Sequence, residues 1–162
     1  MKGIYLGLGT NLGNREENLI QAVGKINEFI GPVINSSSVY ETEPWGFMSE
    51  DKFLNMAVEV KTSLRPSGLL GRMLMIESML GRLREGKQYS SRIIDIDILL
   101  YGKRKINRVS LRIPHPEMHK RRFVLVPLCE IAPDAIHPLF RKSIKTLLEE
   151  CDDKCKVEKI RG

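Results

Sequence analysis

Two aspartates, Asp95 and Asp97, stand two residues apart in the stretch RIIDIDILLYG at 92–102, where six of the eleven residues are Ile or Leu. Side chains at positions i and i+2 of a strand point to the same face, so this spacing places both carboxylates side by side. Adjacent carboxylates repel one another, and burial strengthens the repulsion. A divalent cation would relieve it, and a ligand set made only of oxygens favours Mg²⁺. The strand alone leaves open the alternative of a solvent-facing strand with two surface acids.

The other face of this strand is apolar, which would give the two acids a rigid support. By the same alternation, we expect that face to pack on helices and the acidic face to continue with two apolar side chains. The helix-facing set is Ile94, Ile96, Ile98 and Leu100, and the residues that continue the acidic face are Ile93 and Leu99.

Cationic side chains gather on both sides of this strand in the sequence. Arginine matches phosphate through two parallel hydrogen bonds. Acids that hold a metal ion, ringed by arginines, suit phosphoryl or pyrophosphoryl transfer, because the metal and the guanidinium groups neutralise the charge on the transferred group. The candidates are Arg82 and Arg84 before the strand, Arg92 at its start, and His115, Lys120, Arg121 and Arg122 after it.

A flat organic ring would need its own pocket, and a few aromatic side chains could stack on it. Phe53 and Asn55 lie at positions i and i+2 of a predicted strand, so a phenyl ring and an amide that can hydrogen-bond a heterocycle share one face. Any single Phe is more typical of a protein core, which is the competing interpretation. The other aromatic candidates are Trp45, Phe47 and Phe123.

The elements that must position these residues follow from hydrophobic periodicity and turn signals. The order strand, helix, strand, strand, helix, strand predicts an α+β fold with a ferredoxin-like βαββαβ core, an antiparallel sheet and both helices on one face. Ligand and loops could then cover the other face. Strands are expected at 2–8, 33–42, 53–64 and 92–102, and helices at 14–31 and 65–82. A hairpin arm at 105–114 and helical segments near 121–132 and 143–153 are expected additions toward the C-terminus.

Composition and charge restrict the class of protein. The chain has 162 residues, which suits a single domain spanning 1–162, and its apolar share of 42% favours a globular protein. A formal net charge of +6 and a pI of about 9.3 favour an anionic partner, either nucleic acid or a phosphorylated small molecule. No apolar run reaches the roughly 20 residues of a membrane span, and the N-terminal segment lacks a signal-peptide core. Three cysteines cannot all pair internally, so we expect a cytoplasmic protein.

Two other binding functions compete with phosphoryl transfer. The stretch GLGTNLG at 7–13 follows a predicted strand and precedes a helix, but its spacing is G-x-G-x-x-x-G, whereas a dinucleotide-binding turn needs G-x-G-x-x-G. The sequence also has no G-x-x-x-x-G-K-[ST] phosphate-binding loop. A basic ferredoxin-like RNA-binding domain is the second alternative, because such domains share this topology and charge. The chain lacks the aromatic run that such domains use to stack bases, and only 6% of its residues are aromatic.

Six motifs, in order along nearly the whole chain, carry a resemblance to one enzyme family: GLGTNLGNREENL, SSVYETEPWG, FLNMAVEV, IESMLGRLR, RIIDIDILLYG and IPHPEMHKRRFVLVPLCEIAPD. The chain resembles the 6-hydroxymethyl-7,8-dihydropterin pyrophosphokinases, enzymes of folate biosynthesis. The resemblance implies that ATP gives its β,γ-pyrophosphate to the hydroxymethyl oxygen of the pterin and releases AMP. It also implies that Asp95 and Asp97 bind two Mg²⁺ ions that bridge the triphosphate.

The resemblance assigns further residues to three roles by their motif positions. The catalytic set is Arg82, Arg92, Asp95 and Asp97. The ATP-binding set is Glu77, Arg84, Arg92, Ile98, His115 and Arg121. The pterin-binding set is Asn11, Thr42, Pro44, Trp45, Phe53, Asn55 and Phe123, with the two phenyl rings expected to sandwich the bicycle. The chain departs from the family pattern at Tyr89, Ser90 and Ser91, where Trp-Gly-Pro is frequent, and at Leu74, where Gln is frequent.

The expected partners follow from the same resemblance. They are ATP and the hydroxymethyl dihydropterin, with no nucleic acid and no membrane. Members of the family can be fused to other folate enzymes, whereas a chain of 162 residues is expected to stand alone. We expect a monomer, with an oligomer left open.

Overall fold

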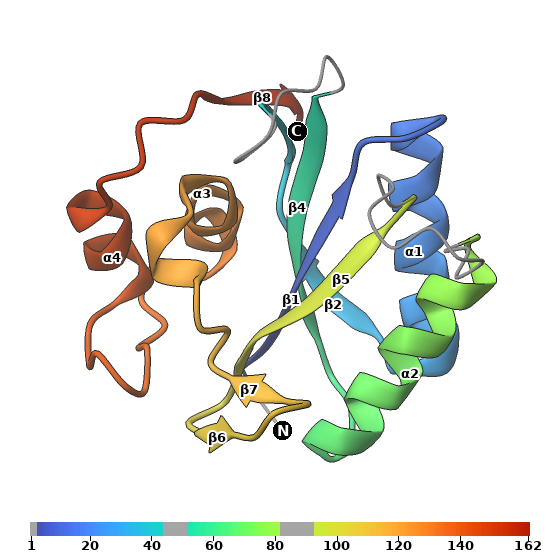
Figure 1. Cartoon of the computed structure of the whole chain (residues 1–162), viewed down its shortest axis with the longest axis horizontal. Coiled ribbons are helices and arrows are strands. Elements are labelled where there is room, and N and C mark those ends of the chain that lie inside the picture. Colours follow the sequence, from blue (N-terminus) through green and yellow to red (C-terminus); the bar gives the residue numbers. More distant parts are fainter. Residues whose placement is uncertain (1–2, 44–51, 82–92) are drawn as a thin grey trace.

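Figure 1 shows the computed structural model of the chain, in which residues 3–43, 52–81 and 93–162 are described. Several residues that the sequence assigns to the site fall outside these ranges, so their roles stay predictions. They are Pro44 and Trp45 of the pterin-binding set, and Arg82, Arg84 and Arg92 of the catalytic and ATP-binding sets.

The centre of the fold is an antiparallel sheet with the strand order β5–β1–β4–β3–β8. Strand β1 (Ile4–Thr10) pairs with β4 (Phe53–Val60) on one side and with β5 (Asp95–Tyr101) on the other. Strand β1 therefore lies between β4, which carries Phe53 and Asn55, and β5, which carries the two acids. The predicted combination of helices with an antiparallel sheet is confirmed.

Three shorter strands extend the sheet beyond β4. Strand β2 (Val33–Ser36) and strand β3 (Val39–Thr42) both pair with β4. The C-terminal strand β8 (Val157–Arg161) pairs with β3 and forms an edge of the sheet. The sequence analysis does not predict β8, because the alternation that marks a strand is weak in a segment where three of five residues are charged.

Helices α1 (Arg15–Phe29) and α2 (Pro66–Met79) contact one another and lie on the same side of the sheet in Figure 1. Asn14 caps α1, because its side chain accepts a hydrogen bond from the backbone N–H of Glu17 at 3.1 Å. Pro66 occupies the first turn of α2, where its missing N–H leaves no helical bond unmade. The buried side chains of both helices form the larger hydrophobic core with β1, β4 and β5.

A third helix covers part of the other face of the sheet. Helix α3 (Arg122–Ile131) contacts β1, β3 and β4, and α4 (Ile144–Glu150) packs against it. The apolar face of α3, with Leu125 and Leu128 buried, forms the second core with Leu99 and other side chains of the sheet. Ligand and loops are therefore not the only cover of this face, because α3 needs an apolar partner and the sheet supplies one.

The remaining elements join these layers. Strands β6 (Ile106–Asn107) and β7 (Arg112–Ile113) pair with one another, which confirms the predicted hairpin arm. The short 3₁₀ helix η1 (Met118–Lys120) leads into α3. None of the helices within the described ranges has the length and apolarity that a membrane crossing requires.

The end of β5 departs from simple alternation. Ile98 packs in the core beside α1 and α2, as predicted, but Leu100 packs with Leu99 in the core beside α3. The register of β5 against β1 shifts between Tyr5 and Leu6, so one extra residue enters β5 at this point. Such a bulge reverses the alternation of faces. The prediction that Leu100 shares the face of Ile98 is therefore wrong, whereas the acids, which precede the bulge, keep their common face.

Substitution of two glycines, one inside α1 and one just after it, tests the close packing of the chain that follows this helix. A Cβ at Gly31 would lie 2.1 Å from the backbone carbonyl oxygen of Lys61, whereas a Cβ at Gly24 would meet no described heavy atom within 4 Å outside its own helix. We expect Gly31→Ala to lower the free energy of unfolding by about 2 kcal/mol or more, because backbone must shift. Gly24→Ala should raise it by about 0.4–1 kcal/mol. Urea denaturation measures both, and equal changes in the two variants would contradict the close approach at Gly31.

Candidate active site

The floor of the candidate site is the face of the sheet that carries Asp95 and Asp97. Strand β1 separates these acids from β4 and has only glycine on this face between them. Gly9 is paired with Asp95 of β5 on one side and with Asn55 of β4 on the other, and Gly7 is paired with Asp97. Residues that are paired across a sheet point to the same face. The acids of β5 and the amide of β4 therefore stand over one shared floor.

The two glycines are required by the space that their neighbours occupy. A Cβ at Gly9 would lie 3.0 Å from Oδ1 of Asn55, and a Cβ at Gly7 would lie 3.3 Å from Cδ2 of Leu99. Either added atom would crowd its neighbour, because ordinary carbon contacts lie at about 3.5–4.0 Å. Both glycines lie inside β1 and not in a turn. The GLG pattern therefore keeps the floor open and does not form the phosphate-binding turn of a dinucleotide fold.

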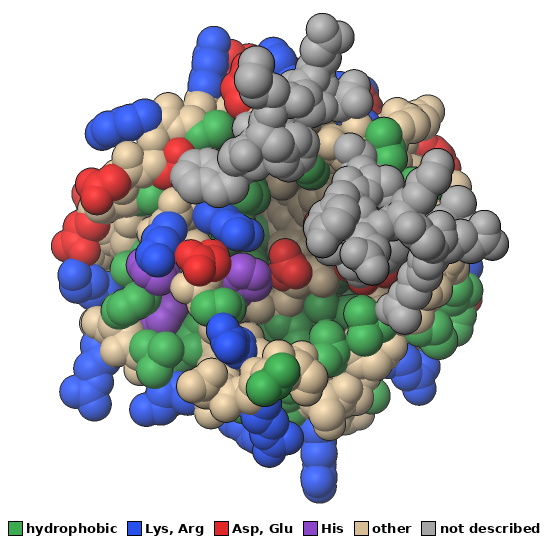
Figure 2. All heavy atoms as spheres, viewed as in Figure 1, with side chains coloured by type: hydrophobic (Ala, Val, Ile, Leu, Met, Phe, Trp, Pro, Cys, Tyr) green, Lys and Arg blue, Asp and Glu red, His purple; other side chains and the backbone are tan. Residues whose placement is uncertain are grey.

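A cavity opens over this floor, between the sheet and the start of α3. Figure 2 shows acidic, cationic and histidine side chains close together near the centre of the same view. Asp97 is exposed and Asp95 is half-buried. The lining brings together seven residues that the sequence assigns to the site, from positions far apart in the chain: Thr42, Phe53, Asn55, Asp95, Asp97, Arg121 and Phe123.

The amide of Asn55 is held in one orientation by its neighbour on β3. Its Nδ2 donates a hydrogen bond to Oγ1 of Thr42 at 2.9 Å. The two side chains are 6% and 2% exposed, so this bond lies away from bulk water at the base of the cavity. A buried amide that is fixed in this way can present a defined donor and acceptor pattern to a polar ring edge.

Arg121 and Phe123, at the start of α3, stand in the wall opposite the floor. The guanidinium carbon of Arg121 lies 5.9 Å from the centroid of the Phe123 ring, which is a cation–π distance. Burial lowers the pKa of the nearby His115, and the positive charge of Arg121 lowers it further. Nδ1 of His115 accepts a hydrogen bond from the backbone N–H of Glu117 at 3.1 Å. The neutral ring therefore carries its proton on Nε2, as a hydrogen-bond donor.

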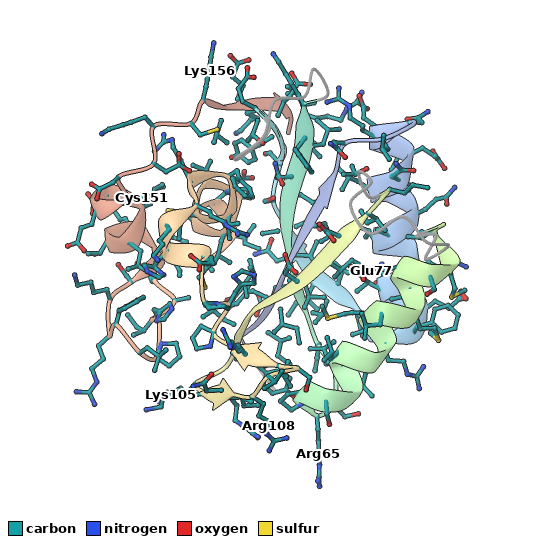
Figure 3. All side chains as sticks on the ribbon, viewed as in Figure 1. Arg65, Glu77, Lys105, Arg108, Cys151 and Lys156 are labelled. Atoms are coloured by element: carbon teal, nitrogen blue, oxygen red, sulfur yellow. The ribbon has the colours of Figure 1, made fainter. Side chains whose placement is uncertain are left out.

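Four described residues of the predicted ATP-binding and pterin-binding sets are not among the residues that line this cavity: His115, Glu77, Ile98 and Asn11. Glu77, labelled in Figure 3, is 3% exposed between α2 and β5, where its Oε2 accepts a hydrogen bond from the backbone N–H of Ile96 at 2.8 Å. The side chain of Ile98 lies in the core on the helix-facing side of β5. A nucleotide contact at Ile98 would therefore involve its backbone. Asn11, at the end of β1, is 3% exposed.

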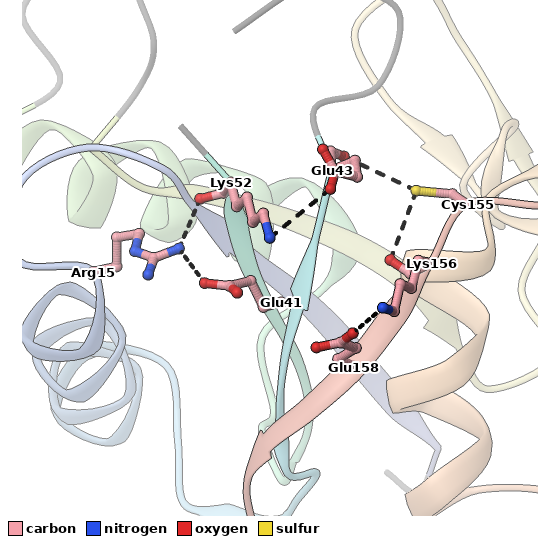
Figure 4. Close-up of polar contacts among 7 residues, drawn as sticks. All are labelled: Arg15, Glu41, Glu43, Lys52, Cys155, Lys156 and Glu158. Carbon is pink, nitrogen blue, oxygen red and sulfur yellow. Dashed lines mark hydrogen bonds and ion pairs between the residues drawn. The ribbon is translucent and has the colours of Figure 1, made fainter. Parts of the chain in front are cut away.

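Ion pairs tie together the chain segments at the ends of β3 and β4. Nη1 of Arg15 lies 2.9 Å from Oε2 of Glu41 and donates to the carbonyl oxygen of Lys52 at 2.9 Å (Figure 4). Nζ of Lys52 lies 3.9 Å from Oε1 of Glu43. The Lys52–Glu43 pair is exposed and contributes little energy. Arg15 adds the start of α1 to this connection, beside the Thr42–Phe53 pair of the β3–β4 ladder.

One carboxylate that is not predicted from the sequence fixes α3 to the sheet. Glu130, the one acid in α3, accepts hydrogen bonds from the backbone N–H of Ser38 at 3.0 Å, from the Ser38 hydroxyl at 2.9 Å and from the Tyr40 hydroxyl at 2.5 Å. Because α3 also carries Phe123, these bonds set the distance between the wall and the floor. A single acid after a run of apolar residues from Phe123 to Cys129 is the signal that could have identified it.

This contact changes the titration of both partners. Burial raises the pKa of Tyr40, and the hydrogen bond and negative charge of Glu130 raise it further, to about 12. Burial also acts to raise the pKa of Glu130, but the hydrogen bonds from Tyr40 and Ser38 outweigh it, so that the pKa is lowered. At neutral pH the pair therefore consists of a neutral phenol that donates to a carboxylate.

Tyr40→Phe tests the contact between α3 and the sheet. We expect it to lower the free energy of unfolding at pH 7 by about 1.5–3 kcal/mol, because it removes a hydrogen bond to a charged group. A raised folded-state pKa stabilises the fold below the unfolded pKa of about 10, and this contribution is lost as the pH rises towards 12. The difference between the two proteins should therefore shrink above pH 10. Urea denaturation at pH 7 and pH 11 measures it, and a difference that grows at pH 11 would contradict the assignment.

Sequence comparison finds relatives of this chain among the pterin pyrophosphokinases. A sequence model described as 7,8-dihydro-6-hydroxymethylpterin-pyrophosphokinase (HPPK) matches residues 5–133. The chain is 42% identical over 150 residues to a 2-amino-4-hydroxy-6-hydroxymethyldihydropteridine pyrophosphokinase of Aquifex aeolicus, covering 93% of this chain and 92% of that protein. It is 46% identical over 128 residues to the protein of the same name in Bacillus subtilis, covering 78% of this chain and 76% of that protein. The alternative of an RNA-binding domain finds no support in these matches.

Solved structures share the fold. A crystal structure of HPPK-DHPS in complex with substrates matches with a TM-score of 0.75 at 17% identity, over 92% of this chain and 43% of that chain. Wild-type HPPK-DHPS of Plasmodium falciparum with pteroate matches with a TM-score of 0.73 at 17% identity, over 93% of this chain and 45% of that chain. The present chain thus spans less than half of the length of these two proteins, and at such identities the match describes the fold alone.

Proposed function

Because this chain belongs to the 7,8-dihydro-6-hydroxymethylpterin-pyrophosphokinase family, we propose that the cavity over Gly7 and Gly9 is its active site. The protein is an ATP-dependent diphosphotransferase of folate biosynthesis. It transfers pyrophosphate from ATP to the hydroxymethyl group of 6-hydroxymethyl-7,8-dihydropterin. One observation carries the proposal: Asp95 and Asn55 flank the same glycine, so a charge-binding side and a ring-binding side share one floor.

The reaction sets two requirements for this cavity. The hydroxymethyl oxygen attacks the β-phosphorus of ATP and loses its proton. The bond from that phosphorus to the oxygen that bridges to the α-phosphorus breaks, and AMP leaves with the bridging oxygen. The site must therefore hold two substrates in line and neutralise the negative charge that moves onto AMP and the transferred group. Separate groups of the cavity suit each requirement.

Asp95 and Asp97 can meet the charge requirement by binding Mg²⁺. The family resemblance implies two such ions. Both carboxylates line the cavity from one strand face. Within 3–43, 52–81 and 93–162, no group of three or more His, Cys, Asp or Glu side chains could hold a metal ion. A seat of two carboxylates takes its other oxygen ligands from ATP and water, which is how Mg²⁺ commonly binds. Bound Mg²⁺ would supply positive charge that stabilises the transferring phosphates.

Phe53 and Phe123 suit the ring requirement from opposite sides. Phe53 belongs to β4 in the floor, and Phe123 belongs to α3 in the wall, and both line the same cavity. A flat bicycle between them would stack on two aromatic faces. Asn55, held by Thr42, can both donate to and accept from the polar edge of the ring.

Arg121 and His115 suit the nucleotide. The guanidinium group of Arg121 lines the cavity and matches phosphate oxygens. The neutral ring of His115 offers its Nε2–H as a donor beside it. The assignments that lie outside the described residues stay part of the proposal by resemblance: Arg82 and Arg92 in transfer, Arg84 at ATP, and Pro44 and Trp45 at the pterin.

We also propose a finer description of the fold and location. The order of β1, α1, β3, β4, α2 and β5, with β1 between β5 and β4, supports a ferredoxin-like core inside one domain. The contact of α1 with α2 supports their position on one face. The free thiols of Cys129, Cys151 and Cys155 suit a reducing compartment such as the cytoplasm.

Product analysis tests the proposed reaction. With Mg²⁺, ATP and 6-hydroxymethyl-7,8-dihydropterin, the protein should release AMP and the pterin diphosphate. ADP in place of AMP would show that a single phosphate is transferred, and an absence of turnover would likewise contradict the proposal.

Substitution of the acids tests the metal seat. Asp95→Asn and Asp97→Asn should each lower kcat by about 10³-fold, because loss of a ligand removes several kcal/mol of transition-state stabilisation. The melting temperature should hold or rise, because one of two like charges is removed. Asp134→Asn, at an exposed acid beyond α3, is the matched control and should leave kcat unchanged. Near-parental turnover of either test variant at saturating Mg²⁺ would show that these carboxylates do not hold the metal.

Phe123→Ala tests the ring pocket. It should weaken pterin binding about 10-fold, because stacking contributes about 0.5–1.5 kcal/mol beyond the burial of the ring. ATP binding should remain nearly intact, since the ring lies on the pterin side. Calorimetric titration with each ligand separates the two effects, with the exposed Phe140→Ala as control. Equal losses for both ligands would mean that Phe123 supports the fold and not the pocket.

A further inference from the structure

The backbone just before β5 is held by side chains from two other elements. The carbonyl oxygen of Ile93 accepts a hydrogen bond from the hydroxyl of Thr10, the last residue of β1. It also accepts a longer one, at 3.4 Å, from the side-chain amide of Asn18 in α1. Thr10 is 1% exposed, so its hydroxyl is shielded from water. One carbonyl group therefore joins the start of β5 to β1 and α1.

These hydrogen bonds have a defined direction. Nδ2 of Asn18 donates one hydrogen to the carbonyl oxygen of Leu12 at 2.7 Å. It shares the other between Oγ1 of Thr10, at 3.1 Å, and the more distant carbonyl oxygen of Ile93. The Thr10 hydroxyl has a single hydrogen, and because it accepts from Asn18 it donates that hydrogen to Ile93. Donation into a bonded hydroxyl strengthens the bond that the hydroxyl makes in turn. Neither Thr10 nor Asn18 is among the residues that line the cavity.

The segment that these bonds hold is the one that carries Asp95. The ladder between β1 and β5 ends at the pair of Gly9 with Asp95, so the bond to Ile93 lies beyond the end of the ladder. On the other side of Asp95, the N–H of Ile96 donates to the buried carboxylate of Glu77 at 2.8 Å. The backbone is thus fixed two residues before Asp95 and one residue after it.

We propose that Thr10 and Asn18 are positioning residues for the metal seat, an inference that rests on the proposed function. Asp95 is the first residue of its strand, and strand ends open most easily. Ligands of a metal must be held to within about 0.5 Å. By fixing the carbonyl of Ile93, Thr10 and Asn18 keep the end of β5 closed and the Asp95 carboxylate beside that of Asp97. They act through the backbone, from the face of the sheet opposite to the cavity.

The test compares two buried threonines. Thr10→Val removes the hydroxyl and keeps the shape, whereas Thr10→Ser keeps the hydroxyl. Thr62→Val is the matched control, because Thr62 is 7% exposed and donates to the carbonyl oxygen of Ile30 at 2.7 Å, away from the cavity lining. Thr10→Val should lower kcat by about 10- to 100-fold and raise the Mg²⁺ concentration for half-maximal rate, with KM for the pterin changed by less than about two-fold. Thr10→Ser and Thr62→Val should behave like the parent protein.

A second pair covers the case in which Thr10→Val fails to fold. Asn18→Ala should show the same pattern more weakly. Asn27→Ala is its control on the same helix, because Asn27 also makes two backbone hydrogen bonds, to Val23 at 3.1 Å and from Val33 at 2.9 Å. Kinetic constants of a test variant that match those of its control would overturn the proposal.

Two readouts do not depend on turnover. Hydrogen exchange should become faster at the amides of 94–96 in Thr10→Val and not in Thr62→Val. Calorimetric titration with Mg²⁺ in the presence of a non-hydrolysable ATP analogue should show metal binding weakened about 10-fold in Thr10→Val. Release of no AMP by the parent protein would refute the proposed reaction. Weaker metal binding in Thr10→Val would still support the positioning role of Thr10 in that case. Faster amide exchange in Thr10→Val with unchanged metal binding would overturn the positioning role, because Thr10 would then stabilise the fold alone.

Discussion

The candidate site depends on a strand that has no side chains where its two neighbours need space. Gly7 and Gly9 leave the floor of β1 bare, and a Cβ at Gly9 would lie 3.0 Å from the amide oxygen of Asn55. Because of this, the acids of β5 and the polar and aromatic residues of β4 can face the same cavity from either side of one central strand. The separation between the acids of β5 and the side chains of β4 is then set by strand spacing, about 4.8 Å per strand, and not by flexible loops. That constraint suits a reaction in which two substrates must meet in line.

Holding two like charges side by side works against folding, and the rest of the structure offsets it. The opposite face of β5 buries Ile96 and Ile98 in the larger core, which fixes the strand that carries the acids. The Thr10 hydroxyl, which donates to the carbonyl oxygen of Ile93, and the Glu77 carboxylate, which accepts from the N–H of Ile96, hold the backbone around Asp95 where the ladder ends. On the other face, the bonds of a single acid in α3 fix the wall of the cavity to β3. The acids of the candidate site are thus placed on a rigid strand, and the interactions that hold this strand and α3 lie outside the cavity.

Local pattern predicts the parts of this site that depend on local geometry. The i, i+2 spacing of Asp95 and Asp97 predicts their common face, and the order of elements predicts helices with an antiparallel sheet. What depends on partners distant in sequence does not follow from pattern. The need for glycine at position 9 follows only from the strand register, which places Gly9 between Asn55 of β4 and Asp95 of β5. The bulge that turns Leu100 towards α3 also depends on how β5 pairs with β1. Strand β8 has little apolar signal of its own and forms by pairing with β3, nearly 120 residues earlier in the chain.

The central claim is that the two acids and the bare glycine floor together form a seat for divalent metal beside a ring pocket. The most direct measurement is a crystal structure of the protein with Mn²⁺, a non-hydrolysable ATP analogue and the pterin, recorded so that manganese gives an anomalous signal. We expect anomalous peaks within about 2.0–2.4 Å of the carboxylate oxygens of Asp95 and Asp97, with the pterin between Phe53 and Phe123. Strong manganese peaks elsewhere, with none at these two acids while the nucleotide is bound, would contradict it.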